Sequence, residues 1–473
     1  MLTSSANANR LPGPRRMPLL GVYGNFILFM RDPTGFMDHL HRSYGEVASL
    51  GRGSTDYVFA FGSEYNQEVL SNTSLFHNLD AKSLPFRIPP NSSLSRLHSG
   101  LIQMNGVKHK QQRQLMMPAF HRKRIEDYYN DFIGVIERRL SGWRAGQQRD
   151  FFQEMRGLTL SVAVKTLVGL DPERGGDDMS KLLERWMGLI FSPLTTMLPF
   201  DLRGLAFHRL LSVSEDLEAV IRKLIERKRV AGLDHKDVLS VLMQSRDEQN
   251  NHLSDDDLVG EINFLFMAGR EATASALTWT LFLLTQHPTV LSNLLDEFRG
   301  ELGGAAPRME QMDDLPLLEA VIKESMRLLP PVLWWSRIST APFKLGQYEL
   351  PRGTQLIHSA FVTHRMADSY SQPDRFLPER WLSNNPGPYE YMPFSAGPRK
   401  CPGSTFAMIE MKLVLSILLQ RYRFTLPARA RVDFSGFMLS APKRGMPVRI
   451  DRKGGRLSRS EVRGSIRRVV DLS

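Results

Sequence analysis

Phe394-Ser-Ala-Gly397-Pro-Arg399-Lys-Cys401-Pro402-Gly403 is the stretch on which the interpretation of this chain depends, and an apolar helical pattern follows it from about 405 to 421. Cys401 is the only cysteine among 473 residues, so neither an internal disulfide nor a metal site built from several cysteines can form. A lone cysteine is usually a small buried apolar residue. The order F-x-x-G-x-R-x-C-x-G arises by chance so rarely that it favours a functional cysteine.

The residues around Cys401 have the chemistry that a metal-bound thiolate requires. Gly397 and Gly403 allow tight turns, which direct backbone N–H groups and the N-terminus of the following helix toward the negative sulfur. The stretch resembles the cytochrome P450 family of haem-thiolate monooxygenases, in its soluble bacterial form. The resemblance implies that haem b binds with the Cys401 thiolate as axial iron ligand. It also implies that Arg399 neutralises a haem propionate and that Phe394 and Gly403 shape the haem site.

The composition predicts a mainly α fold with a minor β-sheet region. A hydrophobic content of 42% supports a well-buried core, and leucine-rich segments outnumber strand-like ones. Because no internal repeat or low-complexity linker divides the chain, residues 1–450 are expected to form one domain. The basic tail 451–473, which carries glycine and serine, is expected to be flexible. The resemblance covers roughly residues 11–450 and places the haem between the long central helix and the helix after Cys401.

The net charge of +11 would suit nucleic acid, an anionic membrane or an acidic protein as partner, and charge alone does not choose among them. The first ten residues are polar, and the longest early apolar run, 26–30, is far shorter than the roughly 20 residues that span a bilayer. Together with the single cysteine, this predicts a cytoplasmic protein without a transmembrane anchor.

Periodicity and turn residues predict the main elements of the chain. These are a β-hairpin at 46–50 and 57–61, helices at 124–170, 210–230, 254–285, 315–329 and 405–421, and strands at 343–348 and 355–361. The resemblance implies that the irregular stretch 83–100 and the proline-broken stretch 191–200 cover the substrate.

His109 and Arg113 are four residues apart, so on a helix they share one face. An ordinary solvated helix face would have the same spacing. The family carries a matching G-x-x-H-x-x-x-R whose histidine and arginine bind haem propionates, and Arg337 matches a further propionate ligand. Lys108, Lys110 and residues 122–124 concentrate positive charge near this segment.

The longest predicted helix begins at Ser254, and Ala268-Gly269-Arg270-Glu271-Ala272-Thr273 lies in its middle. Small residues there could simply allow close helix packing. The resemblance implies instead that this segment crosses the oxygen side of the haem, where Ala268, Gly269 and Ala272 make room for dioxygen and Glu271 and Thr273 relay protons. The family places threonine directly after the acid. Here Ala272 intervenes, and one residue turns a helix by about 100°, which moves Thr273 away from the oxygen.

Glu324 and Arg327 form an E-x-x-R pair, which alone is commonplace on helix surfaces. Its position about 75 residues before Cys401, with Arg380 between them, matches the family. The resemblance implies a buried charge network of Glu324, Arg327 and Arg380 that fixes the loop around the cysteine.

The activity implied is reductive activation of dioxygen and hydroxylation or epoxidation of an apolar substrate, either lipid-like, terpenoid or another secondary metabolite. Expected pocket residues are Phe264, Leu265, Val332, Trp334 and Phe437. Electrons are expected from a ferredoxin or flavodoxin with its reductase, and the enzyme is expected to be a monomer that binds no nucleic acid. Two alternatives stay open: a peroxide-using or rearranging haem-thiolate enzyme, and a non-catalytic haem-binding sensor.

Overall fold

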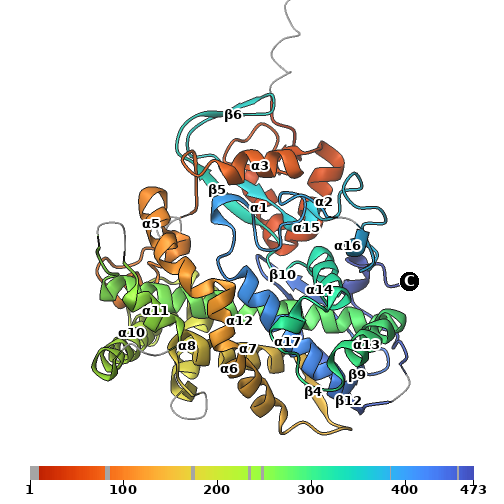
Figure 1. Cartoon of the computed structure of the whole chain (residues 1–473). Coiled ribbons are helices and arrows are strands. Elements are labelled where there is room, and N and C mark those ends of the chain that lie inside the picture. Colours follow the sequence, from red (N-terminus) through yellow and green to blue (C-terminus); the bar gives the residue numbers. More distant parts are fainter. Residues whose placement is uncertain are drawn as a thin grey trace, which may run out of the picture.

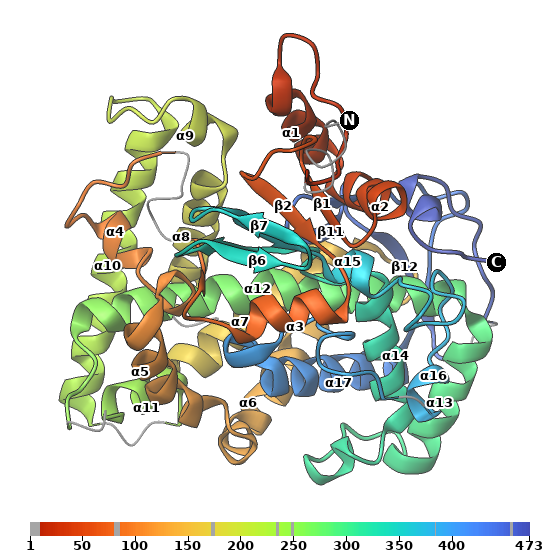
Figure 2. The same cartoon turned by 90° about the horizontal axis from the view of Figure 1, so that it is seen from above.

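Helix α12 (Asp255–Gln286) runs through the helical part of the computed structural model, with most other helices arranged around it (Figures 1 and 2). The structure describes residues 10–79, 86–171, 176–232, 236–246, 250–383, 385–454 and 457–473. The Ser254 side chain caps α12 by accepting a hydrogen bond from the backbone N–H of Asp257. Three aspartates in the first turn complement the positive end of the helix dipole. The predicted start of this helix is therefore confirmed.

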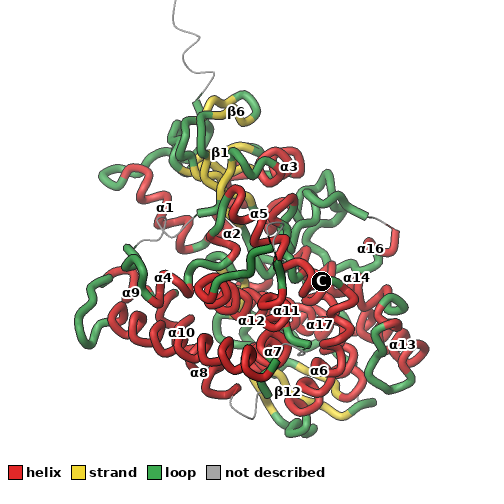
Figure 3. The backbone as a smooth tube through the Cα atoms, turned by 60° about the vertical axis from the view of Figure 1, so that its left-hand side comes forward, coloured by secondary structure: helices red, strands yellow, loops and turns green. Residues whose placement is uncertain are grey.

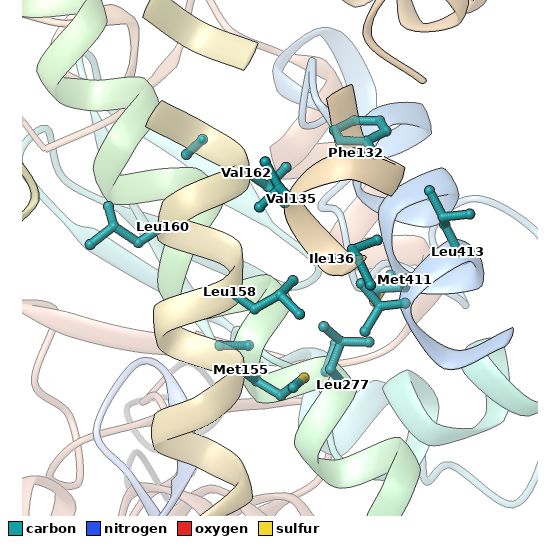
Figure 4. Close-up of a cluster of buried hydrophobic side chains, with 14 of the residues drawn as sticks. Phe132, Val135, Ile136, Met155, Leu158, Leu160, Val162, Leu277, Met411 and Leu413 are labelled. Atoms are coloured by element: carbon teal, nitrogen blue, oxygen red, sulfur yellow. The ribbon is translucent and has the colours of Figure 1, made fainter. Parts of the chain in front are cut away.

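The core lies where α12 meets α6 (Arg122–Leu140), α7 (Phe151–Val168) and α17 (Ser404–Arg421). Figure 4 shows apolar side chains from the four helices pointing toward one another. Phe132, Met155, Leu277 and Leu413, one from each helix, are all fully buried. Removing such a side chain from water is worth about 1.5–3 kcal/mol, so this contact holds α17, and with it the cysteine loop, against the central helix.

A five-stranded sheet has the order β1-β2-β8-β5-β3. Its strands are β1 (Val47–Ser49), β2 (Tyr57–Ala60), β3 (Phe76–His77), β5 (Trp335–Ser339) and β8 (Gln355–His358). The predicted hairpin of β1 and β2 is present, and β2 pairs with β8 in parallel. Figure 3 places β1 and β6 at one end of the molecule and β12 at the other.

One face of this sheet covers the cysteine loop. Trp335 pairs with His358 and Arg337 with Leu356, so these side chains share a face. On it, Trp335 packs against Leu70, Ala360, Met392 and Ala396. Leu70 belongs to α3 (Ser63–Ser71), and Ala396 to the loop before Cys401.

The remaining elements complete the predicted α fold with minor sheets, which is confirmed. The helices are α1 (Gly21–Arg31), α2 (Pro33–Tyr44), α4 (Ser93–Leu97), α5 (Gly106–Met116), α8 (Gly176–Ile190), α9 (Pro193–Met197), α10 (Ala206–Ala231), α11 (Val238–Gln244), α13 (Pro288–Leu302), α14 (Pro316–Leu328), α15 (Ala360–Thr363) and α16 (Arg380–Ser383). The strands are β4 (Gln148–Asp150), β6 (Phe343–Leu345), β7 (Tyr348–Leu350), β9 (Tyr422–Thr425), β10 (Phe434–Gly436), β11 (Ser440–Pro442) and β12 (Pro447–Arg452). None of the helices in the described part of the chain has the length and apolar character needed to span a bilayer.

Two predicted stretches differ from the structure. The pattern predicted as one helix over 124–170 is two helices, because the turn before β4 contains Gly146 with φ +90° and β4 then pairs with β12. The predicted irregular stretch 83–100 contains the short helix α4, while its residues 83–85 lie outside the described residues.

The described residues of the tail after Ile450, which was expected to be flexible, pack against the rest of the molecule. Val462, Ile466, Val470 and Leu472 are buried against the main core. Backbone bridges join Arg463 to Arg431 and Asp471 to Arg375. In addition, the Arg365 guanidinium donates to the Val469 carbonyl oxygen at 3.0 Å. Apolar residues spaced about four apart give the tail a face to bury, despite its many charges.

Candidate active site

The loop before Cys401 is held in a tight turn against helix α3. The Cys401 backbone N–H donates to the Phe394 carbonyl oxygen at 2.9 Å, and that of Lys400 donates to Gly397 at 3.0 Å. Gly397 has φ +68°, and a Cβ there would lie 2.5 Å from the Leu70 carbonyl oxygen. Only glycine fits this conformation and this close approach. The turn delivers Cys401 to the start of α17.

The Cys401 sulfur is partly buried at the N-terminus of α17. Burial raises the pKa of the thiol, and this outweighs the opposing effects of the Gly403 backbone N–H, which donates to the sulfur, and of Arg113 and Lys400. A thiolate here therefore needs a further positive partner, such as a bound metal. Phe394 packs beside the core next to this loop.

Four cationic or potentially cationic side chains gather beside the loop. Arg113 Nη2 donates to the Lys400 carbonyl oxygen at 2.6 Å, and Arg399 Nη2 donates to Asn105 Oδ1 at 2.8 Å. Burial and then Arg399 lower the pKa of Arg337 to about 10. Burial, followed by Arg399, Arg113 and Arg337, lowers the pKa of His109 to about 4. Burial is the main cause of both shifts, and the charges of the neighbouring arginines add to it.

This cluster lacks a negative partner within the described chain. No ion pair between a carboxylate and Arg113, Arg337 or Arg399 is present among the described residues, and Arg399 Nε is buried without a partner. Buried cations require compensating charge. Two carboxylates of a bound group would supply it, and haem carries two propionates. The residues therefore fit the cofactor that the sequence implies.

The structure brings together Glu324 and Arg327 of α14 with Arg380 of α16. Arg327 donates to both Glu324 oxygens at 2.8 and 2.9 Å, and Arg380 Nε donates at 3.1 Å. Glu324 and Arg327 are 0% exposed. The Trp381 indole N–H also donates to Glu324 at 2.9 Å, a contact that the sequence interpretation missed although Trp381 directly follows Arg380. Arg327 further donates to the His364 and Pro373 carbonyl oxygens, which ties two distant segments to α14.

The middle of α12 has one open face. Ala268 is exposed although most neighbouring residues of the helix are buried, and a Cβ added at Gly269 would meet nothing within 4 Å. Ala272, four residues after Ala268 and thus on the same face, is partly exposed. Thr273 is only 5% exposed. Ala268 and Ala272 therefore share an open face with free space beside Gly269, whereas Thr273, four residues after Gly269, is buried.

Glu271 lies between two arginines. Arg156 on α7 approaches Glu271 Oε1 at 2.8 Å, and Arg270 approaches the same oxygen at 3.4 Å. Arg156 is 115 positions away in sequence, and no local signal predicts this pair. The acid of the predicted relay is thus held on the α7 side of α12.

The predicted pocket residues fall into two groups. Val332 forms a backbone bridge with Leu439, and the Trp334 indole N–H donates to the Phe437 carbonyl oxygen at 2.6 Å, so the strand after α14 meets the β10–β11 turn. Trp334 also packs on Phe29 in a core cluster under α1.

The other two pocket residues belong to α12. Phe264 packs against Gly100, and Leu265 is buried in the main core. The lining role of all five predicted residues stays a prediction.

Known proteins resemble this chain in sequence and in fold. The sequence profile described as "Cytochrome P450" matches residues 11–447. Cyclooctatin synthase of Streptomyces melanosporofaciens is 30% identical over 421 residues, which cover 85% of this chain and 88% of the relative. Pentalenene oxygenase of Streptomyces avermitilis is 28% identical over 419 residues, covering 87% and 91%. The solved structure of a retinoic acid-bound cyanobacterial cytochrome P450 superposes with a TM-score of 0.79 at 24% identity, covering 94% of this chain and 99% of that one.

Proposed function

The chain belongs to the cytochrome P450 family of haem-thiolate monooxygenases, and from this premise we propose that it hydroxylates or epoxidises an apolar, terpenoid-like secondary metabolite. We propose that residues 1–450 act as one catalytic domain, with electrons supplied by separate redox proteins. The assignment of the site rests on Cys401 at a helix N-terminus, together with a cluster of arginines that has no negative partner among the described residues.

In this proposal Cys401 ligates the iron, and His109, Arg113, Arg337 and Arg399 hold the propionates. Haem bound in this way supplies reductive activation of dioxygen, with thiolate donation favouring O–O cleavage. The turn at Gly397 packs against α3 and fixes the loop that carries Cys401, so the ligand is oriented before the cofactor binds. Gly403 donates its N–H to the sulfur and moderates the charge on it.

The oxygen side in this proposal is the open face of α12. Ala268 and Gly269 leave space beside the helix, and Ala272 offers no hydroxyl there. Glu271 is held by its ion pair with Arg156 on the α7 side of the helix. We therefore propose that ordered water, or a hydroxyl of the substrate itself, hands protons across this face.

The substrate class rests on the relatives and on the side chains near the site. Pentalenene oxygenase and cyclooctatin synthase are named for terpenoid chemistry, and both align over most of their length. The side chains proposed to line the pocket, Phe264, Val332 and Phe437, are apolar, as expected for a pocket that binds such a compound.

The electron donor is proposed to be an acidic ferredoxin or flavodoxin with its reductase. Around the basic segment, Lys108 pairs with Asp257, Arg122 with Asp313, and Arg124 with Asp127. Lys110 and Lys123 are exposed and form no ion pair among the described residues. These two lysines therefore offer the charge that an acidic partner would meet.

The decisive experiment compares the wild type with Cys401→Ala and with the control Ser416→Ala, a small change at the far end of α17. The wild type and the control are expected to show the thiolate-type spectrum of the reduced carbon monoxide complex. With a bound terpenoid, both should consume oxygen and reductant and yield product. Cys401→Ala is expected to lose both the spectrum and turnover, since no other cysteine can replace it.

The outcomes separate the alternatives. A thiolate spectrum without oxygen consumption for any apolar substrate would favour the sensor. Product formed with peroxide, or by rearrangement without a reductant, would favour the second enzyme class. A Cys401→Ala protein that keeps the spectrum would refute the ligand assignment.

A further inference from the structure

His358, the last residue of strand β8, is a buried histidine whose ring has no hydrogen-bond partner among the described residues. Its side chain is 0% exposed, and neither Nδ1 nor Nε2 has a partner in the described part of the chain. His364, which is also fully buried, shows the usual situation. Its Nδ1 lies 3.2 Å from the Arg327 carbonyl oxygen, and its Nε2 accepts the Met392 backbone N–H at 2.9 Å. Burying an imidazole without such partners costs free energy, so His358 requires an explanation.

His358 lies on the sheet face that covers the cysteine loop. It pairs across the strands with Trp335, and Arg337 follows two positions later on the same face. Burial and then the charge of Arg337 lower the pKa of His358 to about 3. The ring is therefore neutral at physiological pH, with one N–H donor and one acceptor nitrogen. On the loop itself, Ser395 Oγ and Arg399 Nε are also buried and find no partner in the described chain.

These unpartnered atoms and the uncompensated cations point to one missing group. We propose that the neutral His358 ring donates its N–H to the haem propionate that Arg337 binds, and so acts as a positioning residue for the cofactor. This inference rests on the proposed function, since it requires haem beside Arg337. A neutral donor suits this place because it adds a hydrogen bond to the carboxylate without adding another positive charge to Arg113, Arg337 and Arg399.

An ordered water is the competing explanation. Asn66 on α3 donates to Thr363 and Tyr389, while its Oδ1 is buried without a partner. A buried water beside the His358 ring would satisfy it, as another would satisfy Asn66 Oδ1, without any contact with the haem. The two explanations differ in whether a substitution at His358 changes the hydrogen bonding of the propionate.

The test uses the holoprotein and two measurements other than turnover. Resonance Raman spectra report the propionate bending modes, and transfer of haem to excess apomyoglobin reports its rate of loss. His358→Leu is expected to shift one propionate mode and to speed haem loss about tenfold, equivalent to about 1.4 kcal/mol. His358→Gln, whose amide can still donate, should restore most of both values. Ile357→Val, on the opposite face of β8, is the matched control and should change neither.

Each outcome decides the proposal. A wild-type Raman mode in His358→Leu would overturn it, whatever the rate of haem loss, because a water or a packing role leaves the propionate unchanged. If His358→Leu yields no holoprotein, His358→Met is judged by the same criteria. Arg337→Leu distinguishes a failure of the His358 proposal from a failure of the proposed propionate site. A change with Arg337→Leu but not with His358→Leu refutes only the role of His358, whereas no change with either variant refutes the propionate site itself.

Discussion

Replacing Glu324 with glutamine is expected to lower the free energy of unfolding by about 3–5 kcal/mol, the cost of leaving a buried charge uncompensated. The change keeps the size of the side chain and an oxygen that can accept hydrogen bonds, but it removes the negative charge. Arg327, which is 0% exposed, would then face no carboxylate. Burial alone would raise the pKa of Glu324, but hydrogen bonds and charges from Arg327 and Arg380 lower it overall, so the native side chain is ionised at neutral pH.

The matched control is Asp38→Asn. Asp38 and Arg42 form an i,i+4 pair on α2, with side-chain exposures of 36% and 71%. Such exposed pairs contribute up to about 1 kcal/mol, so the control isolates the effect of burial. Urea unfolding followed by circular dichroism gives the free energy for each protein, provided that the slope with urea is unchanged. A loss for Glu324→Gln no greater than that for Asp38→Asn would refute the reasoning, because it would mean that the hydrogen bonds of Arg327 to carbonyl oxygens already compensate its charge.

Three further predictions test other parts of the molecule. Ala272→Thr places a hydroxyl on the open face of α12 and should raise the ratio of product to reductant for substrates without a suitable hydroxyl. Peroxide is measured in parallel, and an unchanged ratio would show that Thr273 or water already relays protons. Lys123→Glu should slow reduction by an acidic donor, whereas Lys344→Glu on the distant strand β6 should not (Figure 1). A reduction rate that is independent of ionic strength would contradict docking at Lys110 and Lys123. Glu218 has its pKa lowered to about 2, because its bonds to Arg96 and Arg222 outweigh burial. The stability that it contributes should thus be complete above about pH 5.5, roughly a unit above the ordinary glutamate pKa, and be lost as the pH falls toward 2. Glu218→Gln should reduce the change of melting temperature with pH in this range. Identical pH profiles of the melting temperature for the wild type and the variant would be evidence against this role of Glu218.

Local chemistry was enough to predict much of this molecule. Ser254 followed by Asp257 predicted where α12 begins, because a cap uses only neighbouring residues. Resemblance on a few spaced residues predicted that Glu324, Arg327 and Arg380 meet. The partner of Glu271 could not be predicted, because Arg156 reaches it only through the packing of α7 on α12.

Sequence reasoning was least successful where composition and spacing disagree. The tail after Ile450 is rich in arginine, glycine and serine, which indicates a solvated end. Yet Val462, Ile466 and Val470 recur every four residues and are buried. His358 gave no signal at all, since a histidine at the end of a strand becomes unusual only when its burial and missing partners are known.

The packed tail has a consequence for how the protein is made. Val469 accepts a hydrogen bond from Arg365, which directly follows the histidine whose carbonyl oxygen anchors Arg327. A ribosome synthesises the cysteine loop well before Val469, so a nascent chain exposes the haem ligand while this last clamp is still missing. Haem captured at that moment would be held by a looser scaffold, and a chain that ends between Arg452 and Val469 would keep the cysteine loop and α17 but would release its cofactor more readily.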